Sequence, residues 1–270
     1  MLWFRGKFGK KYEYKIFNFW RRDWQLSINY FNMSGHSKWA TTKAHKSVID
    51  SKRSSAFTKL SKNITLAAKK GGDLATNFSL RLTVDRAKAA NMPKDNIDRA
   101  IKRGTGEIEG VTFEEVLYEA FGPGGLPLLI EGVTDNKNRT TSEVKAILNK
   151  IDCAIGGENS VKWMFSYKGV IRLPLKGNED KDNLMLELLD LGADDVFEED
   201  GGMTIYCKFE NFERLKKSME EKRLVPDYAE LDWVPKEKVE TDSETLARME
   251  KLIEALEEHD DVNSVYSNLK

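Results

Sequence analysis

The sequence predicts an α+β protein in which a small helical bundle precedes two domains built on β-sheets. Three observations predict this fold class. Apolar residues recur with helical spacing over residues 54–106, strand-like runs flank a strong hairpin signal further on, and residues 167–235 follow a βαββαβ order. The 270 residues suffice for three such cores, and 40% apolar with 32% charged residues is typical of a globular chain.

The charge of the chain changes sign at the end of the expected helical bundle. Residues 33–106 carry 16 Lys and Arg against 5 Asp and Glu, whereas residues 111–270 carry 20 against 35. The net charges of these two stretches are therefore +11 and −15, although the whole chain sums to −1. A basic module attached to an acidic body is typical of a protein that contacts polyanions.

The helical bundle is expected over residues 54–106. Its first helix stops at Gly71-Gly72, its second begins with Asn77 as the N-cap, and its third has Pro93 in the first turn and ends at Gly104. The apolar positions that would form its core are Phe57, Leu60, Ile64, Ala67 or Ala68, Leu80, Val84, Ala87, Ile97, Ala100 and Ile101. Three short helices with short connections indicate an antiparallel bundle.

The second domain is expected to be discontinuous, with residues 107–166 joined by residues 236–270. The turn Gly122-Pro-Gly-Gly125 separates two expected strands, and a helix and a third strand follow. A capping box, Thr241-x-x-Glu244, then begins a helix whose buried stripe would run from Leu246 to Leu256, and a final strand returns to the sheet. The expected strands are 116–121, 126–133, 161–165 and 262–266, and the expected helices are 140–150 and 241–258.

The third domain is expected over residues 167–235. Its strands are predicted at 170–173, 194–197, 203–209 and 228–233, and its helices at 182–191 and 212–222. This order is the split-βαβ, or ferredoxin-like, arrangement.

The N-terminal stretch differs from everything that follows it. Residues 1–32 hold 11 of the 27 aromatic residues among scattered cations, so no uninterrupted apolar segment of a secretory signal is present. We expect them to lie outside the fold, with Met33 as the natural start, although a mitochondrial transit peptide is an open alternative. Residues 33–53 are expected to form a basic arm.

The residues that catalysis requires do not assemble into a known pattern. There is no Walker-type phosphate loop and no His-Glu-x-x-His, and of the three histidines His259 is expected on the surface. The acidic runs at 194–195 and 198–200 indicate a solvated loop. The expectation is therefore a protein that is not an enzyme and that has no cofactor and no metal. Cys153 and Cys207 are expected as reduced core thiols in a cytoplasmic protein.

The basic arm and bundle are the candidate site. Residues 35–46 alternate cations, hydroxyls and Trp39, a combination that pairs phosphates and stacks on bases, whereas a packing role for Trp39 remains an equal alternative. The candidate nucleic-acid-binding residues are His36, Lys38, Trp39, Lys43, His45, Lys46, Lys52, Arg53, Lys59, Lys62, Arg86, Lys94, Arg99, Lys102 and Arg103.

Four ordered motifs carry a resemblance. Gly35-His-Ser-Lys-Trp39 resembles the N-terminal signature of the YebC family, which includes PmpR-type regulators and the mitochondrial translational activator of cytochrome oxidase subunit one. The later blocks that resemble the same family are 89–97 with 99–106, Tyr118-Glu-Ala-Phe-Gly-Pro-Gly-Gly125 and Thr134-Asp-Asn-Lys-Asn-Arg-Thr140. The residues of the first two blocks are of the bacterial type, which favours a cytoplasmic bacterial protein.

The resemblance implies a three-domain regulator of gene expression without enzymatic activity. The family is conventionally described as DNA-binding transcriptional regulators, and the alternative is a ribosome-associated translation factor that contacts ribosomal or transfer RNA. A nuclease is a distant third hypothesis, with Asp95, Asp98 and Asp135 as its only nearby carboxylates. Neither a membrane nor a small-molecule substrate is expected as a partner. The polar loop 135–139 either binds a nucleic-acid backbone or caps a helix.

Overall fold

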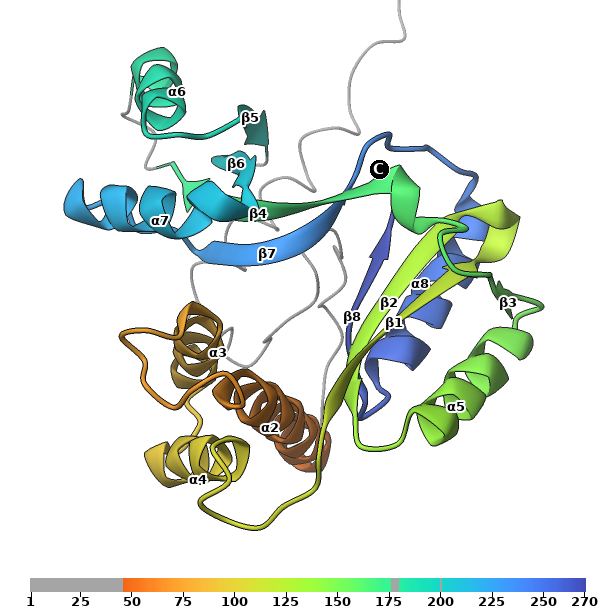
Figure 1. The fold of residues 1–270 in the computed structure, drawn as a ribbon. Coiled ribbons are helices and arrows are strands. Elements are labelled where there is room, and N and C mark those ends of the chain that lie inside the picture. Colours follow the sequence, from red (N-terminus) through yellow and green to blue (C-terminus); the bar gives the residue numbers. More distant parts are fainter. Residues whose placement is uncertain (1–45, 176–179, 200) are drawn as a thin grey trace, which may run out of the picture. The chain divides into compact units, whose positions relative to one another are not determined.

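The computed structural model describes residues 46–175, 180–199 and 201–270, with side chains from residue 54 onward (Figure 1). The chain divides into two compact units at the boundary between Phe113 and Glu114. We call residues 46–113 the helical unit and Glu114–Lys270 the sheet unit, and each is described by itself.

The helical unit contains α2 (Lys46–Ala68), α3 (Phe78–Ala89) and α4 (Lys94–Gly104). Ten buried side chains form its core. The helical spacing predicted every buried apolar residue of this unit except Leu82 and Met92. The residues predicted correctly are Leu60, Ile64, Ala67, Ala68, Leu80, Val84, Ala87, Ile97 and Ala100. Phe57 and Ile101 are only half-buried against this core. The helical periodicity therefore predicted the core correctly.

The ends of these helices confirm one predicted cap and correct two other details. The Asn77 side chain accepts a hydrogen bond from the Leu80 N–H at 3.0 Å, as expected of an N-cap. Pro93 is the N-cap of α4 and lies just outside its first turn. Helix α2 begins at Lys46, well before the expected start near Ser54, and residues 46–53 contain no Gly or Pro that would interrupt it.

The first sheet of the sheet unit has the strand order β3-β1-β2-β8. The strands are β1 (Glu114–Phe121), β2 (Pro127–Thr134), β3 (Ala154–Ile155) and β8 (Val262–Ser267), and all three pairings are antiparallel. Helices α5 (Lys137–Asn149) and α8 (Ser243–Glu257) pack on one side of it (Figure 1). Ile130 of β2 lies opposite Val265 of β8, which confirms that the last strand returns to the sheet begun by the hairpin.

The second sheet has the strand order β5-β6-β4-β7, again antiparallel throughout. Its elements follow in the chain as β4 (Phe165–Pro174), α6 (Lys181–Asp190), β5 (Asp195–Glu199), β6 (Gly202–Lys208), α7 (Phe212–Glu221) and β7 (Tyr228–Pro235). Phe212 of α7 packs so closely on Gly169 of β4 that a Cβ there would lie 2.4 Å from the Phe212 ring. The mixed α+β class with two antiparallel sheets is therefore established. Whether the chain forms three domains with the expected boundaries stays a prediction.

Residues 161–165 do not form the expected strand. A 3-10 turn, η3 (Lys162–Met164), occupies most of this stretch, and β4 starts at Phe165 and runs without interruption to Pro174. The cause is the buried carboxylate of Glu119, which accepts hydrogen bonds at 2.7 Å from the N–H groups of Asn159, Val161 and Lys162. Burial raises the pKa of Glu119, but these three donors outweigh burial and hold the pKa below its ordinary value.

Three local predictions need smaller corrections. The capping box at Thr241 is wrong, because Asp242 is the N-cap of α8 and accepts from the N–H groups of Glu244 and Thr245. Helix α5 begins at Lys137, so most of the expected loop 135–139 is the helix's first turn. The strand expected over residues 194–197 is β5, which runs from Asp195 to Glu199, so Glu198 and Glu199 lie on this edge strand and not in the loop after it; Asp195, Glu198 and Glu199 are exposed, as expected.

Cys153 and Cys207 are both buried free thiols, as the sequence predicted. Burial raises the pKa of Cys207 to about 11, so that thiol is protonated at neutral pH. None of the described helices is both long and apolar enough to cross a lipid bilayer.

Candidate nucleic-acid interface

Only some of the predicted nucleic-acid-binding residues are among those that the structure describes. His36, Lys38, Trp39, Lys43 and His45 lie outside the described residues. Lys46, Lys52 and Arg53 belong to helix α2 by their backbone, and their side chains are not described. The seven remaining candidates are Lys59, Lys62, Arg86, Lys94, Arg99, Lys102 and Arg103.

Helix α4 carries the best-exposed cations of the predicted set. Arg99, Lys102 and Arg103 are spaced by three and four residues, so they share one side of the helix, and each is exposed. Ile97 and Ala100 of the same helix are buried in the core, which fixes the direction of this charged side. Lys94 is also exposed, whereas Lys59, Lys62 and Arg86 are half-buried. The structure therefore concentrates the predicted exposed charge on α4.

The cations of α4 remain available for a ligand within the described part of the chain. Neither Arg99 nor Lys102 nor Arg103 forms an ion pair there, although Asp95 and Asp98 lie on the same helix. Lys102 and Arg103 stand in the last turn, where they also complement the negative end of the helix dipole. A structural role and a binding role are compatible here, because the guanidinium and ammonium groups stay in solvent.

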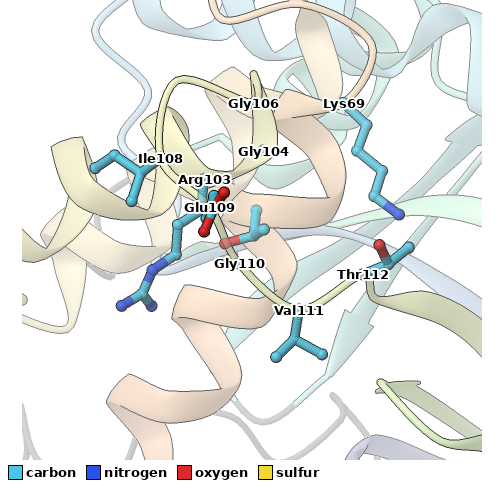
Figure 2. Close-up of a pocket in the computed structure, with 10 residues that line it drawn as sticks. Lys69, Arg103, Gly104, Gly106, Ile108, Glu109, Gly110, Val111 and Thr112 are labelled. Atoms are coloured by element: carbon cyan, nitrogen blue, oxygen red, sulfur yellow. The ribbon is translucent and has the colours of Figure 1, made fainter.

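A shallow cleft of about 480 Å³ adjoins these cations, between the C-terminal parts of α2 and α4 and the segment that leaves α4 (Figure 2). Lys69 points toward Thr112 and donates to the carbonyl of Phe113 at 2.6 Å. Arg103 lies on the other side of this segment, and its aliphatic stem packs on Gly110. These contacts fasten the segment to the bundle. The Lys69 ammonium is held by its hydrogen bond to Phe113, whereas the exposed guanidinium of Arg103 has no hydrogen bond or ion pair with the described residues.

The structure explains why glycine occurs at two positions of the stretch Arg103-Gly-Thr-Gly106. A Cβ on Gly104 would lie 2.3 Å from the carbonyl oxygen of Thr65 and 2.5 Å from the Cβ of Ala68, so this glycine permits the close crossing of α2 and α4. Gly106 has a φ of +82°, in the left-handed region that favours glycine. The motif thus secures the packing of the helix that presents the cations.

The motif Thr134–Thr140 belongs to a polar network centred on Asp261, which follows α8. One oxygen of the buried Asp261 carboxylate accepts hydrogen bonds from the Arg139 guanidinium at 2.8 Å and from the hydroxyls of Thr140 at 2.6 Å and Thr134 at 3.1 Å. The side chain of Asn136 meanwhile caps α5 by accepting from the Arg139 N–H. Of the two roles left open for this stretch, capping is therefore present in the structure.

Arg139 also bonds the carboxylate of Asp135 at 2.7 Å. Its hydrogen bond to Asp261, and secondly that to Asp135, raise the pKa of Arg139 above its ordinary value, so the guanidinium stays charged at every pH of interest. Asp261 could not be predicted as a partner of Arg139, because the local pattern of Asp260 and Asp261 does not indicate burial and the two residues lie 122 positions apart in the chain.

His259 is not the surface imidazole that the sequence predicted. Its side chain is only 14% exposed, and its Nε2 lies 2.8 Å from Glu143 of α5. Its Nδ1 accepts a hydrogen bond from the Asp261 N–H at 3.1 Å, which leaves Nε2 to donate to the carboxylate of Glu143. The histidine therefore ties the end of α8 to α5.

Glu143, His259 and Asp261 bring three metal-ligating atoms within 4.8 Å of one another. Their surroundings do not fit a cation. Arg139 places a positive charge 2.8 Å from the same Asp261 oxygen, and Nδ1 of His259 already accepts a backbone hydrogen bond. We assign this group to the structural network.

Models of one protein family cover nearly all of the described chain. The model described as the TACO1/YebC protein N-terminal domain matches residues 37–107, and that of the TACO1/YebC second and third domain matches residues 113–269. The chain belongs to the TACO1/YebC family. The boundary between these two TACO1/YebC models falls within a few residues of the division between the helical unit and the sheet unit.

Relatives in the TACO1/YebC family carry a regulatory name. Proteins from Chlorobium phaeovibrioides and Halothermothrix orenii, each called a probable transcriptional regulatory protein, are 45% and 47% identical to this chain. The alignments cover 88% and 87% of this chain and 96% and 94% of those proteins. The crystal structure of a conserved hypothetical protein from Aquifex aeolicus is similar, with a TM-score of 0.75 and 38% identity over 87% of this chain and 97% of that one.

Proposed function

We propose that this protein is a regulator of gene expression that binds nucleic acid through the helical unit, with duplex DNA as its conventional target. The observation that carries the proposal is the exposed row of Arg99, Lys102 and Arg103 on α4, in the same unit as the basic segment that begins α2. The regulatory name of the relatives supports the same class. The proposal assigns no catalytic residue, cofactor or metal, and it includes the cytoplasmic location expected from the sequence.

Contacts of this kind act mainly through phosphates. Each phosphate that a cation neutralises releases condensed counterions, so binding weakens steeply as salt rises. Because phosphate contacts position a protein without reading bases, the row on α4 predicts affinity and salt dependence but no target sequence.

The test is a salt titration of binding to a duplex DNA, with the full chain and the variant Arg99→Gln/Lys102→Gln/Arg103→Gln. We expect weaker binding and a salt slope that is smaller by roughly 0.9 for each phosphate that is no longer neutralised. The matched control is Lys145→Gln/Lys150→Gln/Lys251→Gln, which removes three exposed cations of the sheet unit and changes the net charge equally. A slope that is unchanged in the first variant, or equally reduced in the control, would overturn the role of α4.

The second candidate is a translation factor that acts on the ribosome. It is favoured by the composition of residues 35–46, where Trp39 stands among cations and hydroxyls, a set suited to unpaired RNA. A sucrose-gradient profile of cell lysate at moderate and high salt separates the two candidates. Co-migration with ribosomes that is lost at high salt supports the second candidate, and migration at the top of the gradient supports the first.

The three-domain division is part of the proposal as well. The strand order β5-β6-β4-β7, together with the chain order β-α-β-β-α-β, supports a ferredoxin-like third domain over residues 167–235. Limited proteolysis tests this division: cleavage within residues 156–160 and 236–240, outside β4 and β7, that releases a stable fragment supports it, and resistance of both segments contradicts it.

A further inference from the structure

Helix α6, which lies beside β5 (Figure 1), carries leucines on two opposite sides. Leu184 and Leu188 are buried on its inner side. Leu186 and Leu189 lie on its outer side, where they are 61% and 39% exposed, and Met185 between the two sides is half-buried. A helix that is apolar on both sides is normally covered on both. The outer side of α6 is therefore built like a helix–helix contact, yet it faces solvent.

The outer side also carries two aspartates. Asp182, Leu186 and Asp190 follow one another at intervals of four residues, and Leu189 comes three residues after Leu186, so all four lie on one side of the helix. All four side chains are exposed. We call these four residues the outer face of α6. Single exposed leucines are ordinary on protein surfaces, but a leucine pair bracketed by two like charges is a patterned surface.

The chain around the outer face is strongly acidic. Residues 180–195 contain six acidic residues and one cation, Lys181. Lys181 is engaged elsewhere, because it forms an ion pair at 2.5 Å with Glu198 of β5. Neither Asp182 nor Asp190 forms an ion pair with any residue that the structure describes.

Two further lysines meet acids of this stretch away from the outer face. Lys222 pairs with Glu187, and Lys168 lies 3.8 Å from Asp195. The aspartates of the outer face thus keep their negative charge in solvent. Charge complementarity therefore favours an occupant that is basic as well as apolar.

A second copy of this chain does not meet that requirement. Two α6 helices packed on each other through their outer faces, in either direction, would bring aspartates of the two copies together, and like charges at such a contact cost free energy. The occupant must therefore carry the opposite charge at the flanks of its own apolar stripe.

We propose that the outer face of α6 binds an amphipathic helix of a partner protein, whose apolar stripe covers Leu186 and Leu189 and whose Lys or Arg residues face Asp182 and Asp190. Removal of the leucines from water supplies the affinity, and the aspartates select the partner. Because α6 has 10 residues and is about 15 Å long, about three turns of a partner helix suffice. The outer face belongs to the sheet unit, and its role is independent of the nucleic-acid contacts proposed for α4.

The test measures the binding of two fluorescent synthetic peptides to the full-length chain by anisotropy. One peptide is a helix of about 14 Leu, Ala and Lys residues, with leucines at helical spacing and lysines on both flanks. The other has the same composition in an order that gives no apolar side. We expect the first to bind at least about tenfold more tightly. Equal affinities would mean attraction by charge alone and would overturn the proposal.

Leu186→Ala/Leu189→Ala should bind the helical peptide roughly tenfold more weakly, because it removes most of the apolar surface and keeps good helix formers. The matched control is Val225→Ala, at a valine that is 74% exposed outside α6, and it should bind as wild type does. Asp182→Asn/Asp190→Asn should weaken binding mainly at low salt, since salt screens exposed charges. Unchanged affinity in the leucine variant, with wild-type circular dichroism, would contradict the proposal.

Hydrogen exchange of the wild-type protein locates the bound peptide without any variant. Slower exchange at residues 181–191 in the presence of the helical peptide is expected, and slower exchange only at other segments would overturn the assignment to α6.

Two further measurements test other occupants of the outer face. Sedimentation of the chain alone should show no dimer that Leu186→Ala/Leu189→Ala abolishes, because such a dimer would assign the face to a second copy. Deletion of residues 1–32 should leave the affinity for the helical peptide unchanged. Tighter binding after the deletion would assign the face to the chain's own N-terminal stretch and would overturn the partner helix.

Discussion

The guanidinium of Arg139 lies 2.8 Å from the buried carboxylate of Asp261, and this bond joins the first turn of α5 to the loop that precedes β8. Thr134, at the end of β2, donates to the same oxygen. One carboxylate therefore connects three chain segments, and the motif Thr134–Thr140 supplies the guanidinium and both hydroxyls that it accepts from. This arrangement closes the first sheet around its C-terminal strand.

Asp261→Ala should lower the free energy of unfolding by about 2–4 kcal/mol, because three donors lose their acceptor in a buried site. Arg139 is 43% exposed, which keeps the loss below that of a fully buried ion pair. The measurement is urea denaturation followed by circular dichroism. Asp135→Ala removes the other partner of Arg139, at the surface, and should cost less than about 1 kcal/mol. Equal losses in the two variants would contradict the central position of Asp261.

Glu119 predicts a pH dependence of stability. Its pKa is held below the ordinary value of 4.5, so its stabilisation is fully present above that pH and is lost as the pH falls through the lowered folded-state pKa. Glu119→Gln should cost about 2–3 kcal/mol at neutral pH, because the loop 159–162 loses three charge-assisted hydrogen bonds. In urea denaturation the gap to wild type should narrow progressively on acidification below pH 4.5. A gap that stays constant contradicts this role.

Gly104→Ala should destabilise the helical unit by about 1–3 kcal/mol, because the new Cβ would force α2 and α4 apart. Gly110→Ala is the matched control. Its Cβ would lie 3.5 Å from the flexible Arg103 side chain, an ordinary contact, and should change stability by less than about 0.5 kcal/mol. Thermal denaturation of both variants measures the difference. Equal stability of the two would mean that the helices do not cross as closely as described.

The start of α8 gives a test between two neighbouring residues. Asp242→Ala should lower the thermal midpoint, because the N–H groups of Glu244 and Thr245 lose their acceptor. Thr241→Ala should leave the midpoint unchanged, although the sequence pattern favoured Thr241 as the cap. The hydrogen bonds from Thr245 also lower the pKa of Asp242, so the difference between the variants should disappear at strongly acidic pH. A larger effect at Thr241 would restore the capping box.

The features that the sequence predicted depend on neighbours along the chain. The spacing of apolar residues predicts helices α2, α3 and α4 and the side of each that is buried. The turn at residues 122–125 predicts the hairpin of β1 and β2. Predictions failed where a distant residue overrides local pattern. The pattern of residues 161–165 predicts a strand, but the Glu119 carboxylate, some 42 residues earlier, bends the stretch into η3.

The sequence by itself determined the fold class, the helical core and the basic character of the helical unit, because periodicity, turn chemistry and charge are properties of short segments. The tertiary structure alone decided which charges meet and which rings stack. Arg139 finds Asp261 across 122 residues, and Tyr167 finds Trp233 and Phe209 through the register of three strands. Those pairings follow from how the strands and helices pack, and no local pattern encodes them.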